Sequence, residues 1–121
     1  MTRKKTVVLG ATENTDRYAN RAARNLMNQG HAVELVGLRA GAIQGTPIQT
    51  GQPALESVDT VTLYVGTRNQ AGLGEYIKSL KPRRVIFNPG TENRELEEDL
   101  RQNGIEPIEA CTLVMLATGS Y

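Results

Sequence analysis

Residues Thr6-Val7-Val8-Leu9-Gly10 form a short apolar run, and the polar loop after it leads to Asp16-Arg17. A continuous β-branched run that ends in glycine is typical of a strand covered on both faces. From Asp16 to Gln29 apolar residues recur at helical spacing, and Gly30 occupies the position of a C-terminal cap. Thr15 or Asp16 is expected to cap the helix start. The apolar stripe consists of Tyr18, Ala19, Ala22, Ala23, Leu26 and Met27.

The same alternation of strand and helix continues along the chain. Further strands are expected near residues 32–36, 61–65, 85–87 and 106–109, with a short one near 46–48. Helices are expected over residues 73–80 and around Leu96 and Leu100, with a terminal helical turn over 113–117. Strands separated by single helices need crossover connections and therefore pair in parallel. We expect an α/β fold, a three-layer Rossmann-like doubly wound and mainly parallel sheet of five to six strands, in one domain over residues 1–121.

The composition excludes several classes of protein. A chain of 121 residues has the length of one domain, and its net charge of +1 argues against a nucleic-acid module. One Cys and one His argue against a disulfide and a metal site. The apolar run after the basic residues 3–5 is too short for a signal peptide or a membrane span. We therefore expect a cytoplasmic protein with a small-molecule ligand, while a protein partner or a homo-oligomer is left open.

Four segments follow the predicted strands and are the candidate site. In doubly wound folds, ligands bind outside the carboxyl ends of the strands, where the strand order reverses. The segments are residues 10–17, 37–39, 65–68 and 88–91. The first precedes a helix, whose free N–H groups and positive dipole end favour phosphate. Its spacing matches neither G-x-G-x-x-G nor the Walker A loop, so Gly10 alone would also fit an ordinary tight turn.

The end of the second strand discriminates between nucleotides. An NAD-binding domain places an acid there for the ribose 2′-hydroxyl, whereas an arginine suits a phosphate on the ribose. Here the strand ends in Val36-Gly37-Leu38 and Arg39 follows at once. The pattern favours NADP or coenzyme A, and an exposed arginine without a ligand is the remaining interpretation.

The other reactive side chains do not form a catalytic set. Arg17 lies close to the first loop, whereas Arg21, Arg24 and the acidic run Glu97-Glu98-Asp99 are expected on solvated helix faces. His31 precedes the second strand, at the opposite end of the sheet from the predicted site. Cys111 is expected to be a buried or half-buried thiol, because no second His supports a Cys–His pair. We therefore predict binding groups and no catalytic residue.

The order of these motifs resembles the small stand-alone CoA-binding proteins, which are related to the CoA-binding domain of succinyl-CoA synthetase alpha subunits. The matching segments are Val8 to Thr12, Asp16-Arg17, Leu26 to Gly30, Ile43 to Gly45, Val58 to Val61, Gly90 to Glu95, Asn103 to Ile105 and Cys111. The resemblance implies a Rossmann-like fold with the CoA diphosphate at the first loop, the 3′-phosphate at Arg39, and the adenine near Val65-Gly66. The implied ligand is coenzyme A or an acyl-CoA, bound without ligase chemistry. The candidate ligand-binding residues are Gly10, Ala11, Thr12, Asn14, Arg17, Arg39, Val65, Gly66, Arg68, Asn88, Pro89 and Gly90.

The chain also departs from the family pattern. Thr15 stands where the family usually has a proline, and Ala19-Asn20 stands where it has a Ser-Tyr-like pair. Gly37-Leu38 replaces the usual Asn-Pro, and Ala110 replaces a frequent arginine. These changes motivate a second hypothesis, an interaction or regulatory module with a degenerate nucleotide pocket. A third hypothesis is a component of an NADP-binding oxidoreductase, for which a catalytic half would have to come from an oligomer.

Overall fold

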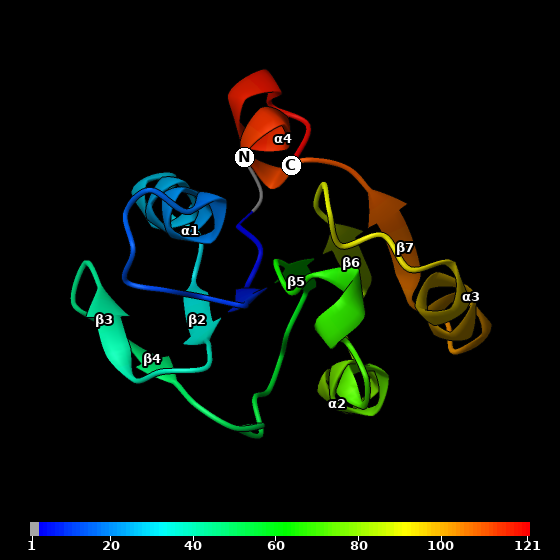
Figure 1. Cartoon of the computed structure of the whole chain (residues 1–121). Helices are drawn as coiled ribbons and strands as arrows, with labels where there is room; N and C mark the ends of the chain where they lie inside the picture. Colours follow the sequence, from blue (N-terminus) through cyan, green and yellow to red (C-terminus); the bar gives the residue numbers. More distant parts are fainter. Residues whose placement is uncertain (1–2) are drawn as a thin grey trace.

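A computed structural model describes residues 3–121 as one seven-stranded sheet with helices on both faces (Figure 1). The strand order is β3-β4-β2-β1-β5-β6-β7, and every neighbouring pair is parallel except β3 and β4. The strands are β1 (Thr6–Leu9), β2 (Val33–Val36), β3 (Gly41–Ile43), β4 (Thr46–Gln49), β5 (Thr60–Leu63), β6 (Arg84–Phe87) and β7 (Glu106–Glu109). The helices are α1 (Tyr18–Asn28), the short 3₁₀ helix η1 (Thr67–Asn69), α2 (Leu73–Leu80), α3 (Arg94–Gln102) and α4 (Thr112–Thr118).

The sheet is buried on both faces, as its apolar runs predict. All four residues of β1 are buried, and β1 pairs with β2 on one side and with β5 on the other. Val8 and Leu35 face α1 and α4, where they pack with Leu26 and Leu116. The opposite face of the sheet packs against α2 and α3. Its core contains Val7, Val61, Leu63, Val85, Phe87, Ile77, Leu80, Leu96 and Leu100.

The predicted fold class is confirmed, with more strands than the five to six expected. The segment between β2 and β5 contains the β3–β4 hairpin, where a single short strand near residues 46–48 was expected. Gln44 and Gly45 both have positive φ, at 49° and 82°, which is the backbone of a two-residue type I′ turn. No helix among the described residues is long and apolar enough to cross a membrane.

Helix α1 differs in detail from the expectation. It begins at Tyr18 rather than Asp16, and its N-cap is Arg17, which makes no side-chain capping bond. The predicted caps Thr15 and Asp16 are therefore wrong. Tyr18 is 65% exposed and does not belong to the buried stripe. The prediction for Gly30 is confirmed, because its φ is +87° and its N–H donates to the carbonyl of Met27 at 3.0 Å.

Candidate functional site

The loops after β1, β2 and β5 are in direct contact at the carboxyl edge of the sheet. A Cβ built on Gly37 would lie 2.2 Å from the carbonyl oxygen of Ala11, so the second loop rests on the first. A Cβ on Gly10 would lie 2.9 Å from the backbone of Tyr64, and Gly10 has a φ of +102°. Both glycines are therefore required by close approach of backbone to backbone.

The loops after β5 and β6 are also joined. The Thr67 hydroxyl donates to the carbonyl of Glu92 at 2.7 Å. The Gln70 side chain, 4% exposed, donates to the carbonyls of Val65 at 2.9 Å and Thr91 at 2.7 Å. All four segments expected from the sequence therefore meet at this edge. The sequence analysis missed Gln70. An amide side chain just outside a predicted loop does not by itself indicate that it joins two loops.

The topology places the first loop where the strand order reverses. From β1 the chain runs through α1 to β2 on one side, and later returns to β5 on the other side of β1 (Figure 1). The crossovers on the two sides cover opposite faces of the sheet, which leaves a crevice at the carboxyl end of β1. The loop of residues 10–17 therefore lies where this kind of fold binds its ligands.

The first loop is held in shape by its own polar groups. The Asn14 side chain accepts from the N–H of Asp16 at 3.0 Å, and the Thr12 hydroxyl accepts from the N–H of Asn14 at 3.2 Å. Asn20, only 2% exposed, donates from Nδ2 to the carbonyl of Thr12 at 2.9 Å. Its Oδ1 accepts from Nε of Arg24 at 2.7 Å. Asn20 is one of the departures from the family pattern, and in this chain it supports the loop.

The same loop is tied to the β3 edge strand. The Glu13 carboxylate accepts from the N–H of Ala42 at 2.9 Å. A Cβ on Gly41 would lie within 2.7 Å of that carboxylate, so the glycine makes room for it. The hairpin that the sequence analysis missed therefore helps to position the candidate site.

The free N–H groups of the loop are not those of its first residues. Gly10 and Ala11 both donate to the carbonyl of Val36, at 2.8 and 2.9 Å. The N–H groups of Thr12 and Glu13 have no hydrogen-bond acceptor within residues 3–121. The N–H groups of Thr12 and Glu13, like that of Thr15, are thus available to a ligand, whereas the predicted Gly10 and Ala11 shape the turn.

The first turn of α1 carries no acidic side chain, although Asp16 directly precedes its N-cap. The N-cap makes no side-chain bond. In contrast, α3 is capped by Asn93, which accepts from the N–H of Leu96 at 3.1 Å, and its first turn contains Glu95 and Glu97. An uncapped helix N-terminus with free N–H groups is suited to an anion.

Three arginines at this edge have no protein partner. Arg17, Arg39 and Arg68 are exposed, and in the described part of the chain their side chains form neither a hydrogen bond nor an ion pair. By comparison, Nε of Arg83 lies 3.2 Å from the Asp59 carboxylate. The guanidinium groups of the three arginines are therefore available to a phosphate.

Asn88, predicted as a ligand contact, is committed to the interior. It is 1% exposed, and its Nδ2 donates to the Thr62 hydroxyl at 2.8 Å and to the Leu63 carbonyl at 2.9 Å. Its Oδ1 accepts from the N–H of Thr112 at 2.8 Å. The side chain links β5, β6 and α4. Its neighbours in the prediction, Pro89 and Gly90, are exposed.

Two reactive side chains, Tyr64 and Cys111, lie near this edge of the sheet. Burial raises the pKa of Tyr64 to about 12, so the phenol is neutral at physiological pH. Cys111 is half-buried, as expected, and precedes α4. His31 lies at the amino end of β2, away from this edge, also as expected. Within residues 3–121 there is no group of three His, Cys, Asp or Glu side chains that could hold a metal ion.

A hollow of about 370 Å³ lies between the segment of residues 67–71, which contains η1, and the start of α3. It is lined by Thr67, Gln70, Ala71, Asn93, Glu95, Leu96 and Asp99. None of the predicted ligand residues lines it, and its two carboxylates oppose a phosphate. The acidic run on α3 was expected to be solvated, but only Glu98 is exposed: Glu97 and Asp99 are half-buried, and Asp99 is paired to Lys78 at 2.8 Å.

A family profile matches nearly the whole length of the chain. The profile of the family described as "CoA binding domain" matches residues 4–117. The chain therefore belongs to the CoA-binding domain family, as the resemblance of its motifs indicated. No curated protein sequence matches the chain closely enough to be counted as a relative.

Solved structures confirm the fold. A crystal structure described as that of an uncharacterized protein is 54% identical, covers 100% of both chains and has a TM-score of 0.97. A Thermus thermophilus protein is 23% identical, with 98% of this chain and 91% of that chain covered and a TM-score of 0.82. A dinucleotide-forming acetyl-coenzyme A synthetase from Ca. Korarchaeum cryptofilum is 18% identical, with a TM-score of 0.71. That match covers 88% of this chain and 25% of the synthetase.

Proposed function

We propose that the protein binds coenzyme A or an acyl-CoA at the carboxyl edge of its sheet, without catalysis of its own. Membership of the CoA-binding domain family supports the ligand class. The observation that carries the location is the uncapped start of α1, beside the free N–H groups of Thr12 and Glu13. These groups and the guanidinium of Arg17 would hold the CoA diphosphate.

Arg39 would hold the 3′-phosphate. It lies in the loop after β2, is exposed and has no partner among the described residues. Leu38 beside it is 99% exposed, so the tip of this loop projects away from the core. A charge-assisted hydrogen bond to a phosphate contributes about 1.5–3 kcal/mol. The loop after β2 can therefore contact the nucleotide and favour ligands that carry a 3′-phosphate over ligands that lack it.

The remaining predicted ligand-binding residues differ in whether their side chains are accessible to a ligand. Gly66 has open space where a Cβ would be, and Arg68 is exposed in the adjacent η1. These, with half-buried Val65 and exposed Pro89 and Gly90, would line the adenine and the far side of the nucleotide. Asn88 would act through the backbone that it positions.

Calorimetric titration with CoA and with 3′-dephospho-CoA tests the proposal. Loss of the 3′-phosphate should weaken binding roughly 10- to 150-fold, and Arg39→Gln should abolish that difference. Arg101→Gln is the matched control, because it removes the same charge from an exposed arginine in the last turn of α3, whose ion pair among the described residues is with Glu98 at 2.7 Å. Equal affinities for both ligands would overturn the role of Arg39.

Titration with NADPH beside CoA separates the alternative functions. Tighter binding of NADPH than of CoA would favour the oxidoreductase hypothesis, to which Arg39 is equally suited. Absence of any CoA binding by the folded protein would favour the degenerate pocket and contradict the proposal.

A further inference from the structure

A second cavity lies at the amino edge of the sheet, opposite the proposed CoA site. Its volume is about 480 Å³, and its wall includes Lys4, Gln29, His31, Leu116, Ser120 and Tyr121. Lys4 precedes β1 and His31 precedes β2, whereas the CoA loops follow these strands. We call it the amino-edge cavity.

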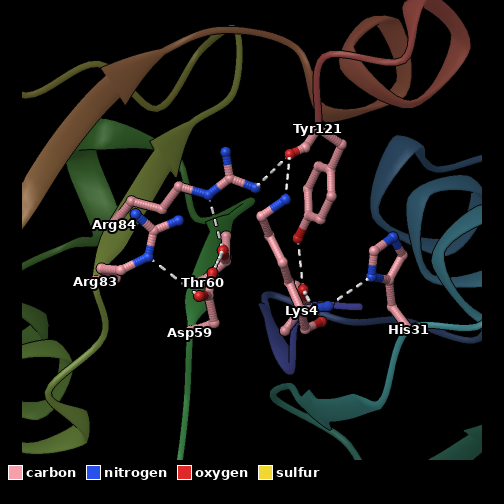
Figure 2. Close-up of polar contacts among 8 residues, drawn as sticks. Lys4, His31, Asp59, Thr60, Arg83, Arg84 and Tyr121 are labelled. Atoms are coloured by element: carbon pink, nitrogen blue, oxygen red, sulfur yellow. Dashed lines mark hydrogen bonds and ion pairs between the residues drawn. The ribbon is translucent and has the colours of Figure 1, made fainter. Parts of the chain in front are cut away.

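His31 presents an unused donor in this wall. The side chain is 6% exposed, and its Nδ1 accepts from the backbone N–H of Lys4 at 2.9 Å (Figure 2). Burial and the charges of Lys4, Arg84 and Arg3 lower the pKa of His31, so the ring is neutral near pH 7. A neutral imidazole that accepts at Nδ1 carries its proton on Nε2. That Nε2 is buried and has no partner among residues 3–121.

Two cationic side chains, Lys4 and Arg84, lie beside the cavity. Nζ of Lys4 donates to the carbonyl oxygen of Tyr121 at 2.8 Å, and Nη2 of Arg84 donates to the same oxygen at 3.2 Å (Figure 2). Both cations also lie near the Tyr121 ring, 5.6 and 4.6 Å from its centre. Asp59, an acid in the same cluster, is bonded to Arg83 at 3.2 Å. Lys4 retains two further N–H donors, because an ammonium has three.

Part of the wall is apolar, alongside the polar Gln29 and Ser120. The Tyr121 ring lies edge-on to His31 with 5.1 Å between ring centres, and the buried Leu116 adds an aliphatic surface. A wall with a cationic end and an apolar body is suited to an amphipathic anion rather than to an inorganic one, whose whole surface needs hydrogen bonds.

We propose that the amino-edge cavity binds a small organic carboxylate with an apolar body. The carboxylate accepts hydrogen bonds from Nε2–H of His31 and from the Lys4 ammonium, and the apolar body packs against Tyr121 and Leu116. This site is separate from the CoA site and does not depend on it.

Titration with benzoate, followed by the NMR signals of the His31 ring and of the Leu116 and Ser120 amides, tests this proposal. We expect these signals to shift saturably. Benzamide, which has the same ring and no charge, and inorganic phosphate, which has no apolar body, should each bind about tenfold more weakly. Equal affinity of either probe, or benzoate shifts confined to the carboxyl edge of the sheet, would overturn it.

A pair of adjacent lysines supplies a matched control. Lys4→Met should weaken benzoate binding about tenfold. Lys5→Met makes the same change one residue away, where Nζ bonds to the carbonyl of Glu56 at 2.7 Å, and should change binding less than about twofold. Equal losses in the two variants would contradict the proposal. If Lys4→Met does not fold, the comparison of benzoate with benzamide on the unaltered protein decides.

Discussion

Adding one methyl group to Gly37 should destabilise the protein, whereas adding it to Gly66 should not. In Gly37→Ala the new Cβ would lie 2.2 Å from the Ala11 carbonyl oxygen and 3.1 Å from Cγ2 of Ile48. The loops after β1 and β2 would have to separate by about 1 Å to restore an ordinary contact. Such overpacking against backbone costs about 1–3 kcal/mol. For a domain of this length, that lowers Tm by roughly 4–12 °C.

Gly66→Ala is the matched control at the same edge of the sheet. Gly66 has no atom within 4 Å of its Cβ position, and its φ of −57° is ordinary for alanine. A substitution of this kind stabilises by about 0.4–1 kcal/mol or leaves stability unchanged. Urea unfolding and thermal melting of both variants measure the difference. Equal stabilities would refute the contact between the first two loops, and with it the geometry of the candidate site.

Three further outcomes follow from the polar contacts. Asn88→Ala should lower the free energy of unfolding by about 2–4 kcal/mol in urea, because it leaves the Leu63 carbonyl and the Thr112 N–H unpaired in the core; a loss below about 1 kcal/mol would contradict this role. Asn20→Ala should cost about 1–3 kcal/mol and weaken CoA binding, whereas Asn25→Ala, on the exposed face of the same helix, should cost under about 0.5 kcal/mol. The pKa of His31 is below 6.5 in the folded state, so as the pH falls the unfolded state takes up a proton at this residue at a higher pH than the folded state does. The free energy of unfolding should therefore decrease as the pH drops below 6.5. His31 contributes at most about 1.4 kcal/mol to this decrease for each pH unit. A His31→Phe variant with the same pH profile would show that His31 is not the cause.

The apolar pattern predicted most of the fold because the central strands are buried on both faces. β1, β5 and β6 are buried at every residue and are rich in β-branched and apolar side chains, and the helical stripes of α2 and α3 are equally clear. β4 was predicted as a short strand near residues 46–48, but β3 and its pairing with β4 were missed, because these short strands at the sheet's edge contain Gly, Pro and exposed residues. Only the positive φ at Gln44-Gly45 reveals the turn.

The candidate site was predicted at the level of loops, and less well at the level of side chains. Parallel strands bring their carboxyl ends to one edge, so the sequence order alone placed the loops of Gly10, Arg39, Gly66 and Gly90 together. The roles of individual polar groups depend on tertiary contacts. For this reason Asn88 was expected to face a ligand although it bonds within the core, and Gln70 was not noticed.

The most direct test of the account is a CoA titration followed by the backbone amide signals of the protein. We expect the largest shifts at Thr12 and Glu13, whose N–H groups would bind the diphosphate, with smaller shifts at Arg39 and Gly66. Signals at the amino edge, such as that of His31, should stay unchanged. No shift at Thr12 and Glu13 under conditions in which CoA binds would contradict the central claim that the start of α1 holds the ligand.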